Sequence, residues 1–298
     1  MFVVVFACTL IVFLLMQVLG DPVRSMLPLG TSQETINAVR ENLGLNDPVL
    51  VQYWRFISNA VVGDFGESLW LGTPALDAAL VTVPKTFVLV LPACVIGVAV
   101  GAFFGMVAGM RPGSKLDKVI TSLTYLVISL AEFWIALILI YLLAVEVHIV
   151  ATSGYGLDFK HLALPLFVLA LRPFAHTVQV MRTNVIQEAQ LPYVMTARSK
   201  GLRDAKVMAR HVLPNASLPV LALAFYDLSR MFIAGTVIEV VFTWPGMGRL
   251  AVDALERGDI PLVEATVVMA AIIVAVLNLL GDLVTFKLDP RTRASIGK

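Results

Sequence analysis

The chain has 298 residues, of which 58% are hydrophobic and only 14% are charged, and its formal net charge is +1. Soluble domains carry about 25% charged residues, so this composition excludes an ordinary soluble enzyme or nucleic-acid-binding protein. It indicates an all-α integral membrane protein. The two cysteines, Cys8 and Cys94, lie in apolar stretches and predict neither a disulfide framework nor a metal site.

Six apolar stretches are long enough to cross a bilayer, which takes about 20 residues. They are residues 1–20, 86–110, 119–145, 162–181, 216–238 and 265–286. The first lacks the basic leader and the cleavage site of a signal peptide, so we expect a retained transmembrane helix. The second carries Gly97, Gly101, Gly105 and Gly109. This spacing predicts a smooth helix face that packs closely against another helix.

Residues 21–85, between the first two spans, are predicted to form two short amphipathic helices. Thr31 and Glu34 have the spacing of a capping box, and Gly44 would end the first helix. Pro48 would begin the second helix, and Gly63 would end it. We therefore expect a helical insert after the first span.

Basic residues concentrate on one side of this predicted topology. The second-to-third and fourth-to-fifth connections and the C-terminal tail together hold 13 Lys and Arg against four acids. The opposite loops hold seven Lys and Arg and 14 acids. The positive-inside rule therefore predicts that both termini are cytoplasmic and that residues 21–85 are external.

The fourth-to-fifth connection is the most basic segment. Six basic residues lie in it or on its approach: Arg182, Arg198, Lys200, Arg203, Lys206 and Arg210. Apolar residues recur every three or four positions at Leu202, Ala205, Met208, Ala209 and Val212, which predicts a short amphipathic helix on the membrane surface that ends or kinks at Pro214. A loop that simply binds anionic lipid is the alternative.

The spacing of four residues in this connection, Ala197, Gly201, Leu213 and Pro214, resembles the EAA loop of importer-type ABC permeases. Further segments resemble the dipeptide/oligopeptide/nickel branch of that family in the family's order: GDPV at 20–23, LGLNDPVLVQY at 43–53, GDFGESL at 63–69, IEVVFTWPGMGRL at 238–250, GDIP at 258–261 and LDPRTR at 288–293. The chain departs from the general loop pattern at Met195 and Thr196, where glutamate and alanine are usual.

The resemblance implies a six-helix permease subunit of a binding-protein-dependent importer for peptides or related small solutes, in the cytoplasmic (inner) membrane of a bacterium or archaeon. Residues 1–20 would be the first span, residues 21–85 an extracytoplasmic helical segment, and residues 86–298 a permease core with a coupling loop at 190–215. The implied ATPase-coupling residues are Ala197, Gly201, Leu202, Arg203, Leu213 and Pro214. Gly201 would supply a turn that a side chain would obstruct, and Ala197 would allow close packing.

The same resemblance implies a set of partners. They are a second homologous permease subunit, two cytoplasmic ABC ATPase subunits and an extracytoplasmic substrate-binding protein, with no nucleic acid. The chain itself would be non-catalytic and would bind no cofactor, because ATP and Mg²⁺ would be used by the ATPase subunits. In agreement, it contains no glycine-rich phosphate loop followed by Lys-Ser/Thr and neither an HExxH nor a GxSxG motif.

Apart from Asp282, which lies near the end of the last span, four charged residues lie inside predicted spans: Glu132, Arg172, Asp227 and Arg230. A charge at the bilayer centre costs about 2.5–3.5 kcal/mol on insertion scales, so such residues face a cavity or one another. Asp227 and Arg230 could pair along one helix, and Glu132 and Arg172 between helices. They are candidates for the translocation path, with purely structural ion pairs as the alternative.

An ion channel or a proton-coupled secondary transporter is the rival function. Residues 152–156 read TSGYG, close to a potassium-filter string. The string falls in a predicted external loop, and a channel has no use for a coupling loop. The four histidines are scattered along the chain, which disfavours a metal site.

Overall fold

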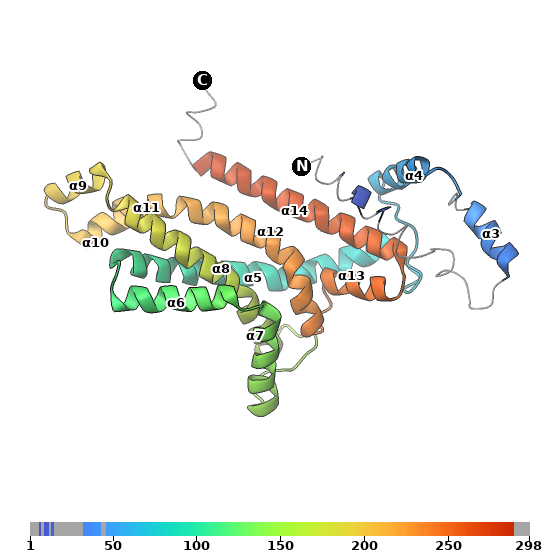
Figure 1. The fold of residues 1–298 in the computed structure, drawn as a ribbon, viewed down its shortest axis with the longest axis horizontal. Coiled ribbons are helices and arrows are strands. Elements are labelled where there is room, and N and C mark those ends of the chain that lie inside the picture. The colour runs from blue at the N-terminus through green and yellow to red at the C-terminus, as the bar shows by residue number, and fades with distance from the viewer. Residues whose placement is uncertain (1–5, 7–8, 12, 15–31, 43–45, 289–298) are drawn as a thin grey trace, which may run out of the picture. The chain divides into compact units, whose positions relative to one another are not determined.

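The computed structural model describes residues 6, 9–11, 13–14, 32–42 and 46–288 (Figure 1). This described part is helical, apart from turns, loops and one isolated antiparallel bridge between Glu67 and Pro74. The chain divides into two compact units. The first comprises Met1–Thr86 with Pro245–Ala275, and the second comprises Phe87–Trp244 with Val276–Lys298.

Four helices in the described part are long and apolar enough to cross a membrane: α5 (Ala75–Met110), α8 (Phe159–Glu188), α12 (Leu218–Val241) and α14 (Ile260–Leu288). They correspond to the predicted second, fourth, fifth and sixth spans. The predicted first span lies mostly outside the described residues. The all-helical membrane architecture is confirmed, with four such helices, or five if the bent pair of the third span is counted as one.

The predicted third span is not one straight helix. Its first part is α6 (Lys115–Ser129). Its second part is α7 (Glu132–Leu139), which continues as the π-helical η1 (Ile140–Glu146). The two parts are bent by 98° relative to each other. The Ser129 hydroxyl donates to the Tyr125 carbonyl and satisfies an acceptor at the end of α6. Glu132 then begins α7, where a carboxylate favours the positive end of the helix dipole.

The first unit contains α3 (Gln33–Asn42), α4 (Val49–Val61) and α13 (Met247–Glu256), together with the starts of α5 and α14. The two helices predicted in residues 21–85 are confirmed as α3 and α4. A buried polar contact joins two distant motifs of this unit: the Ser68 hydroxyl and the Trp70 N–H both donate to Asp259 Oδ2, at 2.5 and 3.0 Å. The Arg257 guanidinium stacks over the Trp70 ring.

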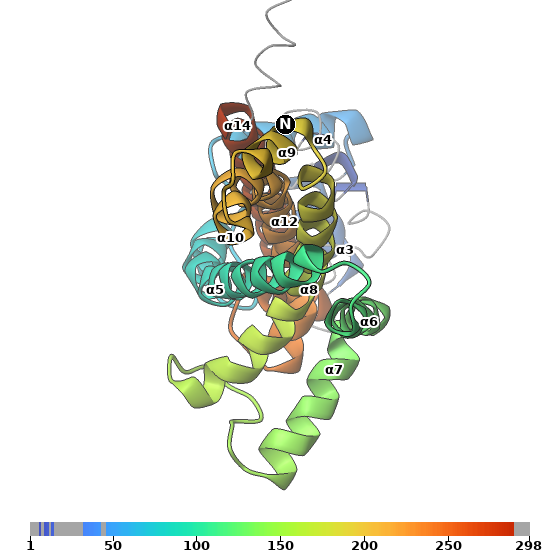
Figure 2. The same cartoon turned by 90° about the vertical axis from the view of Figure 1, so that its left-hand side faces the viewer.

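The second unit is built around α8, which packs against α5, α6 and α12. Figure 2 shows α8 beside α5 and α6, seen from the end that carries α9. The glycine stripe of α5 faces α8 directly: a Cβ atom at Gly97 would lie 2.6 Å from the Ala170 carbonyl oxygen, and one at Gly105 would lie 2.7 Å from Met181 Cβ. Only a helix face without side chains permits this approach, so the predicted close contact is confirmed.

Candidate functional site

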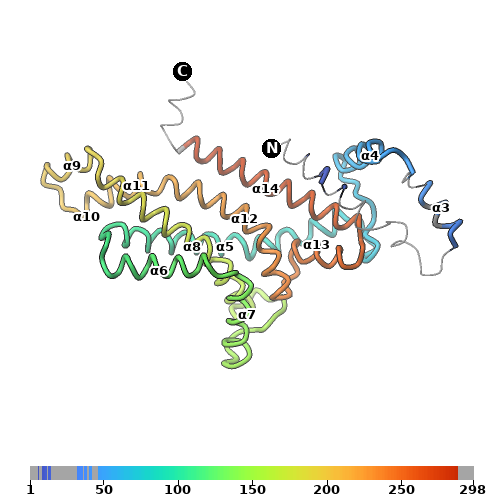
Figure 3. The backbone as a smooth tube through the Cα atoms, in the orientation of Figure 1, coloured from blue at the N-terminus to red at the C-terminus, as the bar shows by residue number. Residues whose placement is uncertain are grey.

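The connection between α8 and α12 folds into two helical arms, which we call the basic hairpin (residues 192–216). The first arm is α9 (Pro192–Ser199). The second runs through α10 (Asp204–Val207), the π-helical η2 (Met208–Val212) and α11 (Leu213–Ala216). In Figure 3 the hairpin lies at the end of α8, beyond the neighbouring ends of α5 and α6. Pro214 does not end the second arm, because it lies in the first turn of α11, where the backbone N–H has no intrahelical partner to lose.

The buried face of the second arm differs from the predicted one. Ala205 and Ala209 are exposed, whereas Val207, Met208 and Val212 are buried. Met208 and Val212 keep the predicted inward face, whereas Val207 of α10 is buried in place of the two alanines. These side chains form one apolar cluster with Val194 and Ala197 of the first arm and with Met181, Val185 and Val220 of α8 and α12.

Among the six predicted coupling residues, Ala197 is buried and lets the two arms pack closely. Leu202 and Leu213 are partly buried against the same cluster, whereas Gly201, Arg203 and Pro214 are exposed. Gly201 has a φ of +78°, the left-handed region that favours glycine. A Cβ atom there would meet nothing within 4 Å, so nothing in the described part of the chain obstructs a side chain. Steric exclusion at Gly201 would have to come from a partner.

A ring of hydrogen bonds ties the hairpin to α8. The Tyr193 hydroxyl donates to Glu188 Oε2 at 2.5 Å and accepts from Asn215 Nδ2 at 3.0 Å. Asn215 Nδ2 also donates to the His211 carbonyl at 3.1 Å. Arg198 Nε donates to Asp204 across the turn between the arms, at 3.1 Å. The spacing of Tyr193, His211 and Asn215 in the sequence gives no hint of this contact.

An ion pair just before the hairpin joins α6 to α8. Arg182 donates through Nε and Nη2 to the two carboxylate oxygens of Asp117, at 2.5 and 2.8 Å. The Gly113 N–H donates to the same carboxylate at 2.8 Å. Asp117 is buried, and such a two-pronged pair fixes direction as well as distance. Sequence reasoning counted Arg182 as part of the basic insert and missed this pairing.

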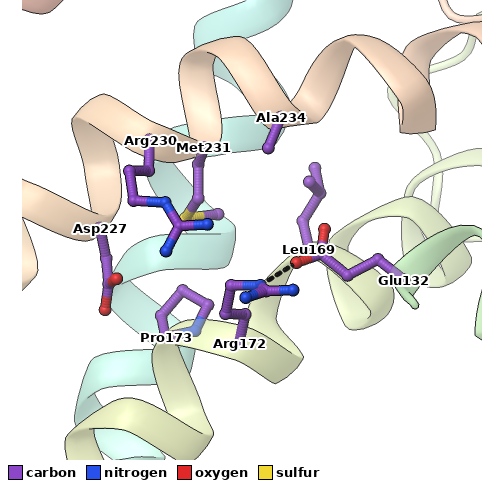
Figure 4. A pocket seen from close by; sticks show the side chains of 8 residues that line it. All are labelled: Glu132, Leu169, Arg172, Pro173, Asp227, Arg230, Met231 and Ala234. Atoms are coloured by element: carbon purple, nitrogen blue, oxygen red, sulfur yellow. Dashed lines mark hydrogen bonds and ion pairs between the residues drawn. The ribbon is translucent and has the colours of Figure 1, made fainter. Parts of the chain in front are cut away.

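The four predicted intramembrane charges line one small pocket, drawn in Figure 4. The expected pair between helices is confirmed, because Arg172 Nε lies 2.5 Å from Glu132 Oε1. The expected pair between Asp227 and Arg230 is not formed. Asp227, which is 2% exposed, instead lies 3.0 Å from His176 Nδ1 on α8. Sequence reasoning missed His176 because α8 and α12 meet only in the fold.

One carboxylate oxygen and one guanidinium of this pocket lack a partner within the described part of the chain. Asp227 Oδ2 is buried without a hydrogen-bond partner, and Arg230 makes no ion pair there. Figure 4 shows Arg172 and Arg230 extending toward the same space from α8 and α12. The cavity in this pocket has a volume of about 10 Å³, which is enough for about one water molecule. The pocket therefore offers both signs of charge but is closed to a larger solute in this conformation.

The filter-like string TSGYG (152–156) lies in a loop that packs against the end of α12. The Gly154 N–H donates to the Phe242 carbonyl at 3.0 Å, and the Tyr155 ring packs 4.8 Å from the Trp244 ring. These contacts give the string a structural role in the second unit. Among the described residues, no three His, Cys, Asp or Glu side chains are grouped so that they could hold a metal ion.

Comparison with known proteins gives matches along nearly the whole chain. Residues 101–294 match the family described as the binding-protein-dependent transport system inner membrane component, and residues 1–87 match the N-terminal region of that membrane component. The oligopeptide transport system permease protein AppB of Bacillus subtilis is 36% identical over 295 residues, covering 95% of this chain and 93% of AppB. A putative peptide transport system permease protein of Brucella abortus is 33% identical, and a probable peptide ABC transporter permease protein of Sinorhizobium fredii is 30% identical, each with 95% of this chain and 93% of the relative covered. The chain therefore belongs to the family of binding-protein-dependent transport system inner membrane components, the permeases of ABC importers.

Proposed function

We propose that this permease imports peptides or related small solutes. Its relatives from Bacillus, Brucella and Sinorhizobium carry names of peptide or oligopeptide permeases and align over almost its entire length. It would act with a second homologous permease, two cytoplasmic ATPase subunits that use ATP and Mg²⁺, and an extracytoplasmic binding protein. Members of this family are non-catalytic membrane components of importers. Membership in it therefore argues against the ion-channel and secondary-transporter alternatives.

The proposed topology has six spans and two cytoplasmic termini in the inner membrane of a bacterium or archaeon. Residues 1–20 form the first span, residues 21–85 the extracytoplasmic segment, and residues 86–298 the permease core. Helix α8 has 30 residues and is therefore about 45 Å long, whereas the hydrocarbon core is about 30 Å thick. If its apolar residues 162–181 span that core, residues 182–188 carry the basic hairpin about 10 Å beyond it, on the cytoplasmic side.

The basic hairpin is the proposed coupling element, seated on an ATPase subunit. The observation that carries this proposal is Gly201, which has a left-handed backbone conformation and open space around it at the exposed turn of the hairpin. We infer that the surface of a partner occupies this open space and lies directly against Gly201. Closure of the ATPase pair would then move the hairpin, and α8 and α12 would move with it through their shared apolar cluster.

The test uses two glycines with the same local geometry. Gly113 has a φ of +79° and open space around it, but it lies in the α5–α6 turn outside the hairpin. Asparagine tolerates the left-handed region, so Gly201→Asn and Gly113→Asn keep the backbone and add a side chain. We expect Gly201→Asn to lower peptide uptake by about tenfold and to weaken co-purification of the ATPase subunits, a loss of about 1.4 kcal/mol. Gly113→Asn should have little effect. Equal effects of the two substitutions would rule out seating at Gly201.

The pocket of Glu132, Arg172, Asp227 and Arg230 is the proposed part of the translocation path. Asp227 Oδ2 and the Arg230 guanidinium lack partners in the described part of the chain, and such groups can bind the ammonium and carboxylate groups of a peptide. The pocket would have to widen during transport, because it now holds about one water molecule.

The double variant Asp227→Asn, Arg230→Gln tests the path proposal. We expect it to change the ratio of uptake of free peptides to that of peptides with blocked termini. The double variant Arg249→Gln, Asp253→Asn is the control, because it removes an ion pair of 3.5 Å on α13 and neither residue lines the pocket. Unchanged rate and substrate preference in the first double variant would leave only a structural role for these charges.

A further inference from the structure

The outer face of α9 is a neutral strip in an otherwise basic hairpin. Pro192, Met195, Thr196 and Ser199 have the i, i+3, i+4, i+7 spacing of one helix face, and all four are exposed. Met195 is the large side chain of this strip, which we call the α9 ridge, and is 60% exposed. The inward face of the same helix, Val194 and Ala197, is buried in the hairpin core.

The two hydroxyl groups of the α9 ridge are turned back onto the helix. Thr196 Oγ1 donates to the Pro192 carbonyl, and Ser199 Oγ donates to the Met195 carbonyl, both at 3.0 Å. Their donors are therefore already used, and the ridge offers a partner mainly methyl and methylene surface. The Tyr193 hydroxyl holds α9 against α8, which fixes the direction in which the ridge points.

The basic side chains lie off the α9 ridge. Arg198 pairs with Asp204, and Lys200, Arg203, Lys206 and Arg210 are exposed without an ion pair in the described part of the chain. A helix that lies in lipid presents several large side chains such as Trp, Phe and Leu on its apolar face. The ridge has one large apolar side chain and stands about 10 Å beyond the hydrocarbon core on the length of α8. A shallow protein groove therefore fits it better than a bilayer does.

We propose that Met195 is the apolar anchor of this permease on its ATPase subunit, and that the ATPase groove facing the α9 ridge is apolar at this point. The proposal rests on the proposed coupling role of the hairpin and names the chemistry of that contact. In the general form of this loop a glutamate stands at this position, which calls for a cationic or hydrogen-bonding partner. Met195 carries no charge and its thioether is only a weak hydrogen-bond acceptor, so it selects a matching ATPase and disfavours one built for a carboxylate.

The experiment titrates the ATPase subunits that co-purify with the wild-type chain onto permease complexes in nanodiscs. We expect Met195→Leu to bind within about twofold of wild type, and Met195→Ala to bind on the order of tenfold more weakly, as for a buried interface anchor. Met195→Glu should bind on the order of a hundredfold more weakly, because the contact would bury an unpaired charge. Met110→Glu is the control, since Met110 is also exposed, lies at the end of α5 and is outside the hairpin.

The outcomes separate this inference from the coupling role itself. Tight binding of Met195→Glu, equal to or above that of wild type, would show a basic groove and overturn the proposal. Unchanged binding of Met195→Ala would show that the ridge does not contact the ATPase, with the same consequence. If even the wild-type chain retains no ATPase subunit, the coupling role fails. Because Met195 is exposed in the chain, thermal unfolding of all variants should match that of wild type, which excludes misfolding as the cause.

Discussion

The contact between α5 and α8 makes a sharp prediction about two glycines in membrane helices. A Cβ atom at Gly101 would lie 2.6 Å from the Phe174 carbonyl oxygen and 2.8 Å from Thr177 Cβ. A Cβ atom at Gly235 on α12 would have its nearest neighbour, Val90 Cγ2, at 3.6 Å, which is ordinary van der Waals contact. An alanine methyl group would therefore clash with backbone at position 101, whereas the space at position 235 can hold it.

The magnitude follows from two opposing terms. Alanine gains about 0.5–1 kcal/mol over glycine in a helix interior because it restricts the unfolded backbone. Overpacking a close contact costs about 1–3 kcal/mol, and the atom in the way at Gly101 is backbone, which cannot rotate aside. The overpacking cost therefore lies in the upper part of its range, at about 2–3 kcal/mol, and we expect Gly101→Ala to lower the free energy of unfolding by about 1–2.5 kcal/mol. Gly235→Ala should leave it unchanged or raise it by up to about 1 kcal/mol.

Thermal unfolding of the purified chain in nanodiscs, followed by the exposure of buried Cys94, measures both variants against wild type. The expected order of midpoint temperatures is Gly235→Ala at or above wild type, and Gly101→Ala below both. If the two variants shift the midpoint equally, the close approach of α5 to α8 does not determine stability. A Gly101→Ala variant that unfolds like wild type would mean that the helices separate at no cost.

Two further pairs of substitutions test polar contacts, each pair with one buried and one exposed site. Asp117→Asn removes the charge that holds Arg182 with two hydrogen bonds. We expect it to lower the free energy of unfolding by about 2–4 kcal/mol, because a buried pair loses one partner. Arg198→Gln breaks the exposed pair with Asp204 and should lower the free energy of unfolding by less than about 1 kcal/mol in the same assay. Ser68→Ala leaves buried Asp259 with one donor fewer and should cost about 1–3 kcal/mol, whereas Ser58→Ala, at an exposed hydroxyl bonded to a local carbonyl, should be neutral. Equal unfolding midpoints for the two serine variants would contradict the role of Ser68.

Hydropathy located the long membrane helices because the bilayer selects for one property over about 20 residues. It underestimated α5, which begins at Ala75, since Asp77 and Lys85 interrupt the apolar composition without interrupting the helix. It also missed the 98° bend after Ser129. No proline or glycine marks that bend, and its support comes from a serine back-bond and from Arg172 on another helix.

The candidate sites were predicted to the extent that they depend on local pattern. The charges in the spans identified the pocket, because isolated charges in a membrane must find partners. The pairing of Asp227 with His176 depends on the packing of α8 against α12, which no sequence period encodes. The 3.6-residue period placed Met208 and Val212 correctly on the buried face of the hairpin, but it did not anticipate the burial of Val207 or the π turn that follows it.

The hydrogen-bond ring around Tyr193 leads to a prediction that separates coupling from stability. Tyr193→Phe removes one hydroxyl, worth about 1 kcal/mol at a partly exposed site, and leaves the apolar core of the hairpin intact. Coupling between sites typically amounts to about 1–3 kcal/mol, so loss of this link should lower the solute imported per ATP hydrolysed about fivefold while unfolding barely changes. Tyr226→Phe, at an exposed tyrosine on α12, should change neither quantity. A Tyr193→Phe variant that imports normally, or that unfolds as early as Gly101→Ala, would show that the ring does not transmit motion from the hairpin to α8.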